Sequence, residues 1–355
     1  MTQTRSFVSR IIFSALIAGT ALSFIPTLSK AESNKEVNLY SYRKPFLIKP
    51  MLDEFTKQTG IKVNTVFAEK GMLEKIRSAG ANNPADAVLT VDIGRLNELK
   101  EAGLLQSVKS KILSANIPSH LRQPDGLWFG LTLRARMVLA SKERVKAGEI
   151  ATLNDLADPK FHNSICVRSG KHAYNIALIA SIIANEGAAK AEKWLRGVKA
   201  NLARKPQGND RAQAKGIYEG ACNITLANNY YMGNMATNDK KPEQKEWAKS
   251  VRVIFLDQGG RGQHVNISGA AVTSTAKNKS NAIKLIEFLS GDFAQKMYAA
   301  QNHEYPVKKG VEWSEIVKSW GTFKMDPINL EEIAKNRKAA SKLVDKVGFD
   351  DGPNS

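Results

Sequence analysis

Strands and helices alternate in the early part of the chain, and this alternation limits the fold more than any other feature. The segments 36–41 and 61–67 carry the β-branched and apolar residues of strands, and apolar side chains recur at helical spacing between them. A turn at 84–86 leads into a third strand, and a helix is predicted over 93–102. This repeated strand–helix order predicts an α/β fold with a doubly wound sheet.

Two further strands look like crossings between domains. Residues 128–130 lead into a long, mostly apolar strand predicted at 131–140, and a returning strand is predicted at 268–272. A second α/β pattern lies between them, with a strand at 164–167. Even without its first 31 residues, a chain of this length exceeds what one core usually serves. We therefore expect two lobes, a cleft between them and a two-strand hinge, as in periplasmic binding proteins. The first lobe would comprise 32–133 and about 266–310, and the second 134–265 and about 311–355.

The first 31 residues have the features of a signal peptide. Arg5 and Arg10 form a basic start, and 11–26 is an apolar stretch too short to span a bilayer. Small residues at the two positions read by a signal peptidase predict cleavage after Ala31. The alternative is a retained membrane anchor. We expect an exported, soluble protein of a bacterial periplasm.

The chain is strongly basic, with a formal net charge of +18. Its Lys and Arg residues are scattered along helical faces, without a basic run or interleaved aromatic residues. Together with export, this pattern argues against a nucleic-acid partner. The charge favours an anionic ligand or simply solvates the surface.

Two cysteines, Cys166 and Cys222, are the only ones in the chain. An even count in an oxidising compartment predicts one disulfide. A catalytic thiol would need an activating histidine nearby, and the local sequence does not offer one.

Three tyrosines follow these cysteines at a matched interval. Residues 222–228 have the pattern of a buried strand, an Asn-Asn turn signal ends it, and Tyr230 and Tyr231 come next on a segment expected to be irregular. Tyr174 follows a glycine turn at the entry to an apolar helix, and it lies as far beyond Cys166 as Tyr230 lies beyond Cys222. If the disulfide joins neighbouring strands, the three phenols emerge at one sheet edge, where α/β proteins bind ligands. The alternative is ordinary packing with the hydroxyl groups at the surface.

The chain carries none of the familiar enzyme signatures. The chain has no Gly-x-Ser-x-Gly, His-Glu-x-x-His, P-loop or Cys-x-x-Cys motif, and the glycine-rich run at 258–263 reads as a turn. We therefore expect that the protein is not an enzyme. Three converging phenol oxygens suit a hard trivalent cation, because hard metals prefer oxygen donors.

Four short motifs carry a family resemblance: Val37–Ser41 followed by Arg43, Pro84-Ala85-Asp86 before Asp92, Tyr174-Asn175, and Asn229-Tyr230-Tyr231. Together with the signal peptide, they resemble the periplasmic ferric-iron-binding proteins of ABC transporters over essentially the whole mature chain. The resemblance implies a type II periplasmic-binding-protein fold and delivery of Fe(3+) to an inner-membrane ABC permease. It also implies that Tyr174, Tyr230 and Tyr231 are the iron ligands.

The sequence departs from that family at one place. Many members continue the first strand with Arg-His-Tyr and gain a ligand there, whereas this chain has Arg43-Lys44-Pro45. It resembles the subgroup that uses three tyrosines of the second domain and a synergistic anion such as carbonate. Arg43 and Arg134 would hold the anion, because a guanidinium group matches its fork of oxygens. The alternative for Arg134 is an interdomain salt bridge, and the adjacent Tyr42 is a less favoured ligand.

The leading prediction is thus a monomeric periplasmic protein that captures ferric iron for a permease. The second hypothesis is the same fold with an organic ligand, such as a polyamine, thiamine or a phosphonate. A secreted enzyme or adhesin is the third. Addition of ferric iron separates the first from the other two, because only phenolate–iron coordination gives a visible charge-transfer band.

Overall fold

The computed structural model describes Met1 and residues 35–353 of the chain. The predicted signal peptide at 1–31 therefore lies outside the described residues, apart from its first residue. Within the described part, no helix combines the length and apolarity needed to cross a membrane.

The early strand–helix alternation is confirmed. β1 pairs in parallel with β2 on one side and with β3 on the other, and helices connect the three strands. Gly60 ends the first helix in the left-handed conformation (φ 69°), which suits a residue without Cβ. The elements are β1 (Glu36–Ser41), α1 (Pro45–Thr59), β2 (Lys62–Phe67), α2 (Met72–Ala79), β3 (Ala87–Thr90), α3 (Ile93–Glu101) and α4 (Lys111–Asn116).

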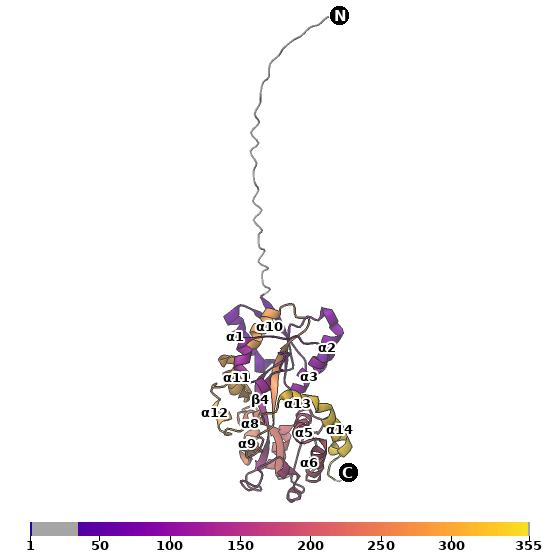
Figure 1. Ribbon diagram of the computed structural model, residues 1–355. Helices are drawn as coiled ribbons and strands as arrows, with labels where there is room; N and C mark the ends of the chain where they lie inside the picture. Colours follow the sequence, from indigo (N-terminus) through magenta and orange to yellow (C-terminus); the bar gives the residue numbers. More distant parts are fainter. Residues whose placement is uncertain (2–34, 354–355) are drawn as a thin grey trace. The chain divides into compact units, whose positions relative to one another are not determined.

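Two long strands run through the centre of the molecule, as the sequence predicts. All residues of β4 (Phe129–Ser141) and β7 (Val265–Val272) are buried, and the two strands pair in antiparallel fashion. β7 also pairs with β3, whereas the second half of β4 pairs with β5 (Ile224–Asn228) and β6 (Val251–Ile254). The sheet order β2-β1-β3-β7-β4-β5 therefore joins two groups of elements, and Figure 1 shows β4 passing from one group to the other.

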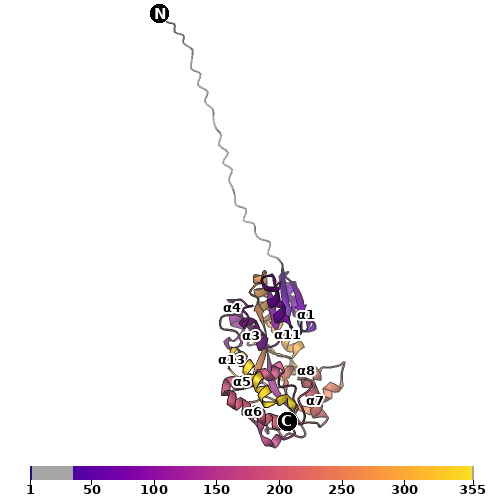
Figure 2. The same ribbon diagram turned by 90° about the vertical axis from the view of Figure 1, so that its right-hand side faces the viewer.

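Helices surround the second half of β4. In Figure 2, α7 and α8 lie to the right of this lower group, and α5 and α6 lie to the left. α5 is mostly apolar, and its buried residues 175–183 allow α6, α13 and α14 to pack against it on several sides. The helices are α5 (Ala173–Glu186), α6 (Ala188–Ala200), α7 (Asp210–Tyr218), α8 (Asn229–Ala236) and α9 (Glu243–Ser250).

The last part of the chain contacts both groups. α10 packs on β1 and β7, α11 precedes the short strand β8 that pairs with β4, and α13 lies between α3 and α5. These elements are α10 (Lys279–Leu289), α11 (Asp292–Asn302), β8 (Tyr305–Pro306), α12 (Glu315–Lys318), α13 (Leu330–Lys335) and α14 (Arg337–Val347). The exact limits of the two lobes stay a prediction.

The strand predicted at 164–167 is wrong. Only Ile165 forms bridges there, to Leu202 and Ile224. The carbonyl group of Ile165 accepts from the amide of Ala203, but that of Val167 accepts from Gln207. From Ile165 to Val167 the chain advances by two residues, whereas its partner segment advances by four, from Ala203 to Gln207. In a parallel ladder both strands advance by two, so this mismatch interrupts regular pairing.

Candidate functional site

The three predicted tyrosines come together at the end of β5. Tyr174 is the second residue of α5, and Tyr230 and Tyr231 lie in the first turn of α8. The hydroxyl group of Tyr230 donates to that of Tyr174 at 3.0 Å, and the rings of Tyr230 and Tyr231 are 4.5 Å apart, tilted by 34°. The structure therefore gathers all three phenols in one place.

The expected irregular segment around Tyr230 and Tyr231 is in fact a helix. α8 starts directly after β5, with Asn228 at its N-cap position. Consecutive helical residues are separated by about 100°, so neighbouring side chains still diverge less than on a strand. An Asn-Asn pair is typical of a turn, but asparagine is equally favoured at the start of a helix.

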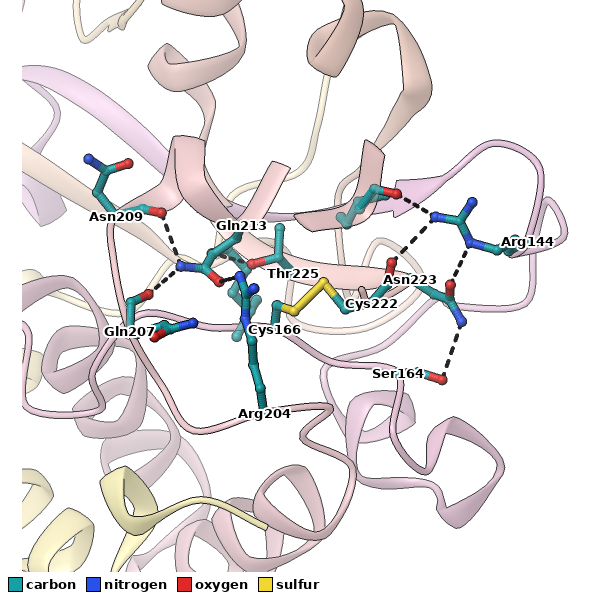
Figure 3. The surroundings of a disulfide bond; sticks show 12 residues. Arg144, Ser164, Cys166, Arg204, Gln207, Asn209, Gln213, Cys222, Asn223 and Thr225 are labelled. Atoms are coloured by element: carbon teal, nitrogen blue, oxygen red, sulfur yellow. Dashed lines mark hydrogen bonds between the residues drawn. A yellow bond between two sulfur atoms is a disulfide. The ribbon is translucent and has the colours of Figure 1, made fainter. Parts of the chain in front are cut away.

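The predicted disulfide between Cys166 and Cys222 is confirmed, with Cα atoms 5.8 Å apart. It fastens the segment before α5 to the start of β5, and Ile165 bridges Ile224 beside it. Figure 3 shows the bond between these two segments. Because both segments then run toward the same edge, their tyrosines meet there, as the matched spacing predicts.

A cleft of about 410 Å³ opens in front of the phenols. Tyr174, Tyr230 and Tyr231 line one side of this cleft. Residues that follow β1 line it too, and further lining groups come from the start of α7 and from the segment after α11. These residues are Tyr42, Arg43, Lys44, Phe46, Leu47, Val91, Arg134, Asn209, Arg211, Asn234, Asn302 and Glu304.

Three guanidinium groups surround the Tyr174 ring. Those of Arg134, Arg136 and Arg168 lie 5.7, 5.9 and 5.2 Å from its centroid. Arg134 donates to the carbonyl groups of Val91 and Ile267 and is only 2 % exposed, and its Nε has no partner among the described residues. Its partners are thus backbone carbonyl groups, and the side chain adds positive charge beside the phenols.

Arg43 is already engaged by a carboxylate of the chain. Its guanidinium group donates three hydrogen bonds to Glu304, at 3.2, 3.1 and 2.8 Å, and one to Ser268 at 2.5 Å. Thr132 donates to the same carboxylate. Ser268 and Thr132 belong to the two central strands, so this buried ion pair lies on β4 and β7. The anion-binding role of Arg43 stays a prediction, and Glu304 competes for the same guanidinium group.

Tyr42 lines the cleft but is occupied by another contact. The guanidinium group of Arg95 stacks on its ring at 4.0 Å. Burial raises the pKa of Tyr42 above its ordinary value of 10.0. Its hydroxyl group is therefore a neutral donor at neutral pH.

Burial also governs the ionisation of the tyrosine cluster. The pKa of Tyr230 is raised well above 10.0, first by burial and then by the neighbouring phenols. Burial and the carboxylate of Asp210 raise the pKa of Tyr231. At neutral pH these phenols hold their protons, and a strongly charged cation would have to displace them.

Polar residues support the cluster from behind: His172, which the sequence places near Tyr174, and Asp210, which no sequence pattern singled out. The Nδ1 atom of His172 accepts from the amide of Tyr174 at 3.2 Å, so this histidine caps α5. Burial, Arg168 and Arg136 lower the pKa of His172 to about 4, so the imidazole is neutral. Asp210 is fully buried and pairs with both of these arginines. In the sequence, Asp210 directly follows Asn209, a helix-capping residue. This position predicts the start of a helix but does not reveal that the Asp210 side chain is buried.

The fold and the cleft define a two-lobed binding protein, and comparison with known proteins shows its family. The chain belongs to the bacterial extracellular solute-binding proteins, whose family model matches residues 62–327. The solved structures that it resembles have the two-lobed type II periplasmic-binding-protein fold, which confirms the predicted fold class.

Particular relatives are iron-transport proteins. Iron uptake protein A1 of Synechocystis sp. is 42% identical over 91% of this chain and 90% of its own length. The ferric iron-binding protein A of Mannheimia haemolytica, in an open conformation, is 52% identical with a TM-score of 0.84. That match covers 89% of this chain and 99% of the other.

A Trichodesmium protein (IdiA, FutA) in complex with iron and citrate is also similar. It is 44% identical with a TM-score of 0.86, and the match covers 88% of this chain and 99% of the other. These relatives are binding proteins of iron transport and not enzymes, in agreement with the sequence analysis.

Proposed function

We propose that this chain is a periplasmic solute-binding protein that captures ferric iron and hands it to an ABC permease. Tyr174, Tyr230 and Tyr231 would supply the protein's oxygen ligands. The observation that carries the proposal is the convergence of their three phenols, with the hydroxyl groups of Tyr230 and Tyr174 3.0 Å apart. The names of the relatives support the choice of metal, since several are iron uptake or ferric iron-binding proteins.

The chemistry of the cleft fits such a cargo. Ferric iron is a hard cation and favours oxygen donors, and its charge makes it able to displace the protons of buried phenols. The three phenolates formed in this way would balance the charge of the ion. Three protein ligands leave other coordination positions for an added anion, such as carbonate or citrate.

Arg134 is the better placed of the two predicted anion partners. Its guanidinium group lies beside the Tyr174 ring and donates to backbone carbonyl groups, whereas that of Arg43 is paired with the Glu304 carboxylate. The Nε atoms of both arginines lack a partner among the described residues. We propose that Arg134 attracts the anion, and that Arg43 contributes only if Glu304 yields to the incoming carboxylate. The relative that holds iron together with citrate supports an anion of this kind.

A polyamine is the weaker candidate ligand for this cleft. Its lining includes the guanidinium groups of Arg43, Arg134 and Arg211 together with Lys44, and its only carboxylate, Glu304, already pairs with Arg43. A cationic organic ligand would therefore meet like charges.

Tyrosine-to-phenylalanine substitutions test the proposed ligands. Phenylalanine keeps the ring and its packing but removes the oxygen donor. We expect Tyr174→Phe, Tyr230→Phe and Tyr231→Phe each to weaken ferric iron binding by more than about tenfold, since even groups that only support metal ligands are worth 10–100-fold. The visible phenolate–iron band should weaken in parallel during titration with ferric citrate.

Tyr42→Phe is the matched control, because Tyr42 lines the same cleft and is stacked on Arg95. We expect it to leave the affinity and the band nearly unchanged. A Tyr231→Phe protein with the parent's affinity, band and melting temperature would refute the ligand assignment.

A further inference from the structure

A buried carboxylate stands behind the three tyrosines. Asp210 is the first residue of α7 and is fully buried. Its carboxylate accepts from Arg136 at 2.7 Å, from Arg168 at 3.2 Å and from the backbone amide of Asn228 at 3.0 Å. One side chain thus joins the start of α7, the strand β4, the segment before α5 and the end of β5.

Through Arg136, this carboxylate reaches the start of α5. Arg136 donates from Nη2 and Nε to the side-chain oxygen of Asn175, at 2.7 and 3.2 Å. The amide group of Asn175 in turn donates to the carbonyl groups of Arg168 and Ser169. Asn175 directly follows Tyr174, so the position of the Arg136 guanidinium group bears on the backbone that carries this phenol.

Through Asn228, the same carboxylate reaches the start of α8. The amide of Asn228 is held by Asp210, and its side-chain oxygen accepts from Arg136 at 3.2 Å. The side-chain nitrogen of Asn228 donates to the hydroxyl group of Tyr230 at 3.4 Å. The residue that begins the tyrosine-bearing helix is therefore fixed on both its backbone and its side chain.

Charge balance gives Asp210 a second role. Arg136 is 1 % exposed and Arg168 is mostly buried, and both guanidinium groups lie against the Tyr174 ring. The guanidinium group of Arg168 also interacts electrostatically with the phenol group of Tyr231. A buried cation that loses its partner must find another or move toward water. Without Asp210, the two arginines would rearrange next to the phenols.

The other side of α7 is anchored independently. Gln213 donates from its side-chain nitrogen to the carbonyl groups of Gln207 and Asn209, and it accepts from Arg204. Figure 3 shows this network beside the disulfide. These contacts of Gln213 hold the loop that leads into α7 in place, and they thereby fix the position of Asp210 behind the cleft.

We propose that Asp210 is the positioning residue of the tyrosine cluster: it aligns the starts of α5 and α8 and neutralises the two arginines behind Tyr174. Asp210 does not line the cleft, so its role would be to position the ligands and not to bind the cargo. The consequence for iron rests on the proposed function, because it requires that the tyrosines are the ligands.

Asp210→Asn tests the proposal with the least change of shape. It keeps one acceptor and removes the charge that holds Arg136 and Arg168. We expect ferric iron binding to weaken by tenfold or more, the usual effect of losing a group that orients metal ligands. The phenolate–iron band should also shift or lose intensity, which a loss of stability alone would not cause.

Asp86→Asn is the matched control. Asp86 is also fully buried and accepts from the amides of Asn38 and Asn278 and from the Asn278 side chain, but it lies before β3, far from the tyrosines along the sheet. We expect it to lower the melting temperature while affinity and band stay within twofold of the parent. If Asp210→Asn fails to fold, Arg168→Gln takes its place, with an expected weakening of at least threefold.

A second measurement separates this inference from the proposed function. The Asn228 amide donates to Asp210, so its hydrogen exchange in the iron-free protein should be at least tenfold faster in Asp210→Ala than in the parent. Unchanged exchange, or a folded Asp210→Asn or Arg168→Gln protein with the parent's affinity and band, overturns the positioning role. A parent protein that binds no ferric iron overturns the proposed function, and the exchange measurement still decides whether Asp210 holds α8.

Discussion

Tyr230 is the residue on which the chemistry of the site depends most. It lies between the other two phenols, with its hydroxyl group on Tyr174 and its ring against Tyr231. Burial raises its pKa well above 10.0. A neutral phenol in this position costs little in the free protein, but it must give up its proton before it can bind a metal.

Iron affinity should therefore rise with pH. The raised pKa values of Tyr230 and Tyr231 keep both phenols protonated at neutral pH, so binding releases protons and a lower pH opposes it. We expect a gain of about tenfold in affinity per pH unit for each proton released, between about pH 6 and pH 8. Competition titrations against a chelator of known pH dependence measure this slope, and an affinity independent of pH would contradict the phenolate model.

Single residues of the site differ in how far the sequence could predict them. Tyr174 and the cysteines could be found because spacing along the chain is visible in the sequence. The Arg43–Glu304 pair could not, since its partners are 261 residues apart and no local pattern links them. Asp210 could not be found either, because a first-turn acid on a helix is usually exposed and only the tertiary structure buries it.

At the scale of elements, the strands were predictable where hydrophobicity alone decided them. β4 and β7 are buried along their whole length, and their apolar residues were enough to predict both strands, although β7 begins at Val265, three residues before the predicted start. The segment 164–167 could not be judged in this way. It is mostly apolar, but regular pairing fails because the neighbouring segment is out of register between Ala203 and Gln207. α8 was missed because the same asparagines suit a turn and a helix start, and β5 directly before it determines which one forms.

The disulfide is the element-level constraint that brings the tyrosine-bearing segments together. Its loop of 56 residues gives a chain-entropy stabilisation of roughly 4 kcal/mol at most. We expect the Cys166→Ser/Cys222→Ser protein to be less stable by roughly 2–4 kcal/mol in denaturant unfolding, and to bind iron more weakly because Ile165 and Ile224 are no longer fastened side by side.

Reductant provides the control for this prediction. It should destabilise the parent protein and leave the double variant unchanged. A double variant as stable as the oxidised parent would show that packing around β5 holds the two segments without the bond.

At the scale of the whole molecule, two central strands link the tyrosine-bearing part to the rest. β4 and β7 carry Thr132 and Ser268, which bind the Arg43–Glu304 pair, so a buried polar network lies on the strands predicted to form the hinge. All three phenols come from α5 and α8, which fall within the second lobe predicted from the sequence. An iron ion bound by these three phenols alone would make few contacts that favour closure of the two lobes. A ligand drives such closure only if it binds the closed state better than the open state.

The two-lobed architecture was predictable because the sequence shows two apolar strands on either side of a second α/β pattern. Such strands are expected where a chain crosses from one domain to another and returns. The way its last helices contact both parts was not, because α13 packs against α3 and α5 through residues distant in sequence.

The most direct test of the account is the crystal structure of the iron-loaded protein, with anomalous diffraction recorded at the iron absorption edge. We predict one anomalous peak within bonding distance of the hydroxyl oxygens of Tyr174, Tyr230 and Tyr231, with Asp210 still paired to Arg136 and Arg168 behind them. A peak elsewhere in the molecule, or a peak that contacts fewer than two of these oxygens, would contradict the central claim that the three tyrosines bind ferric iron.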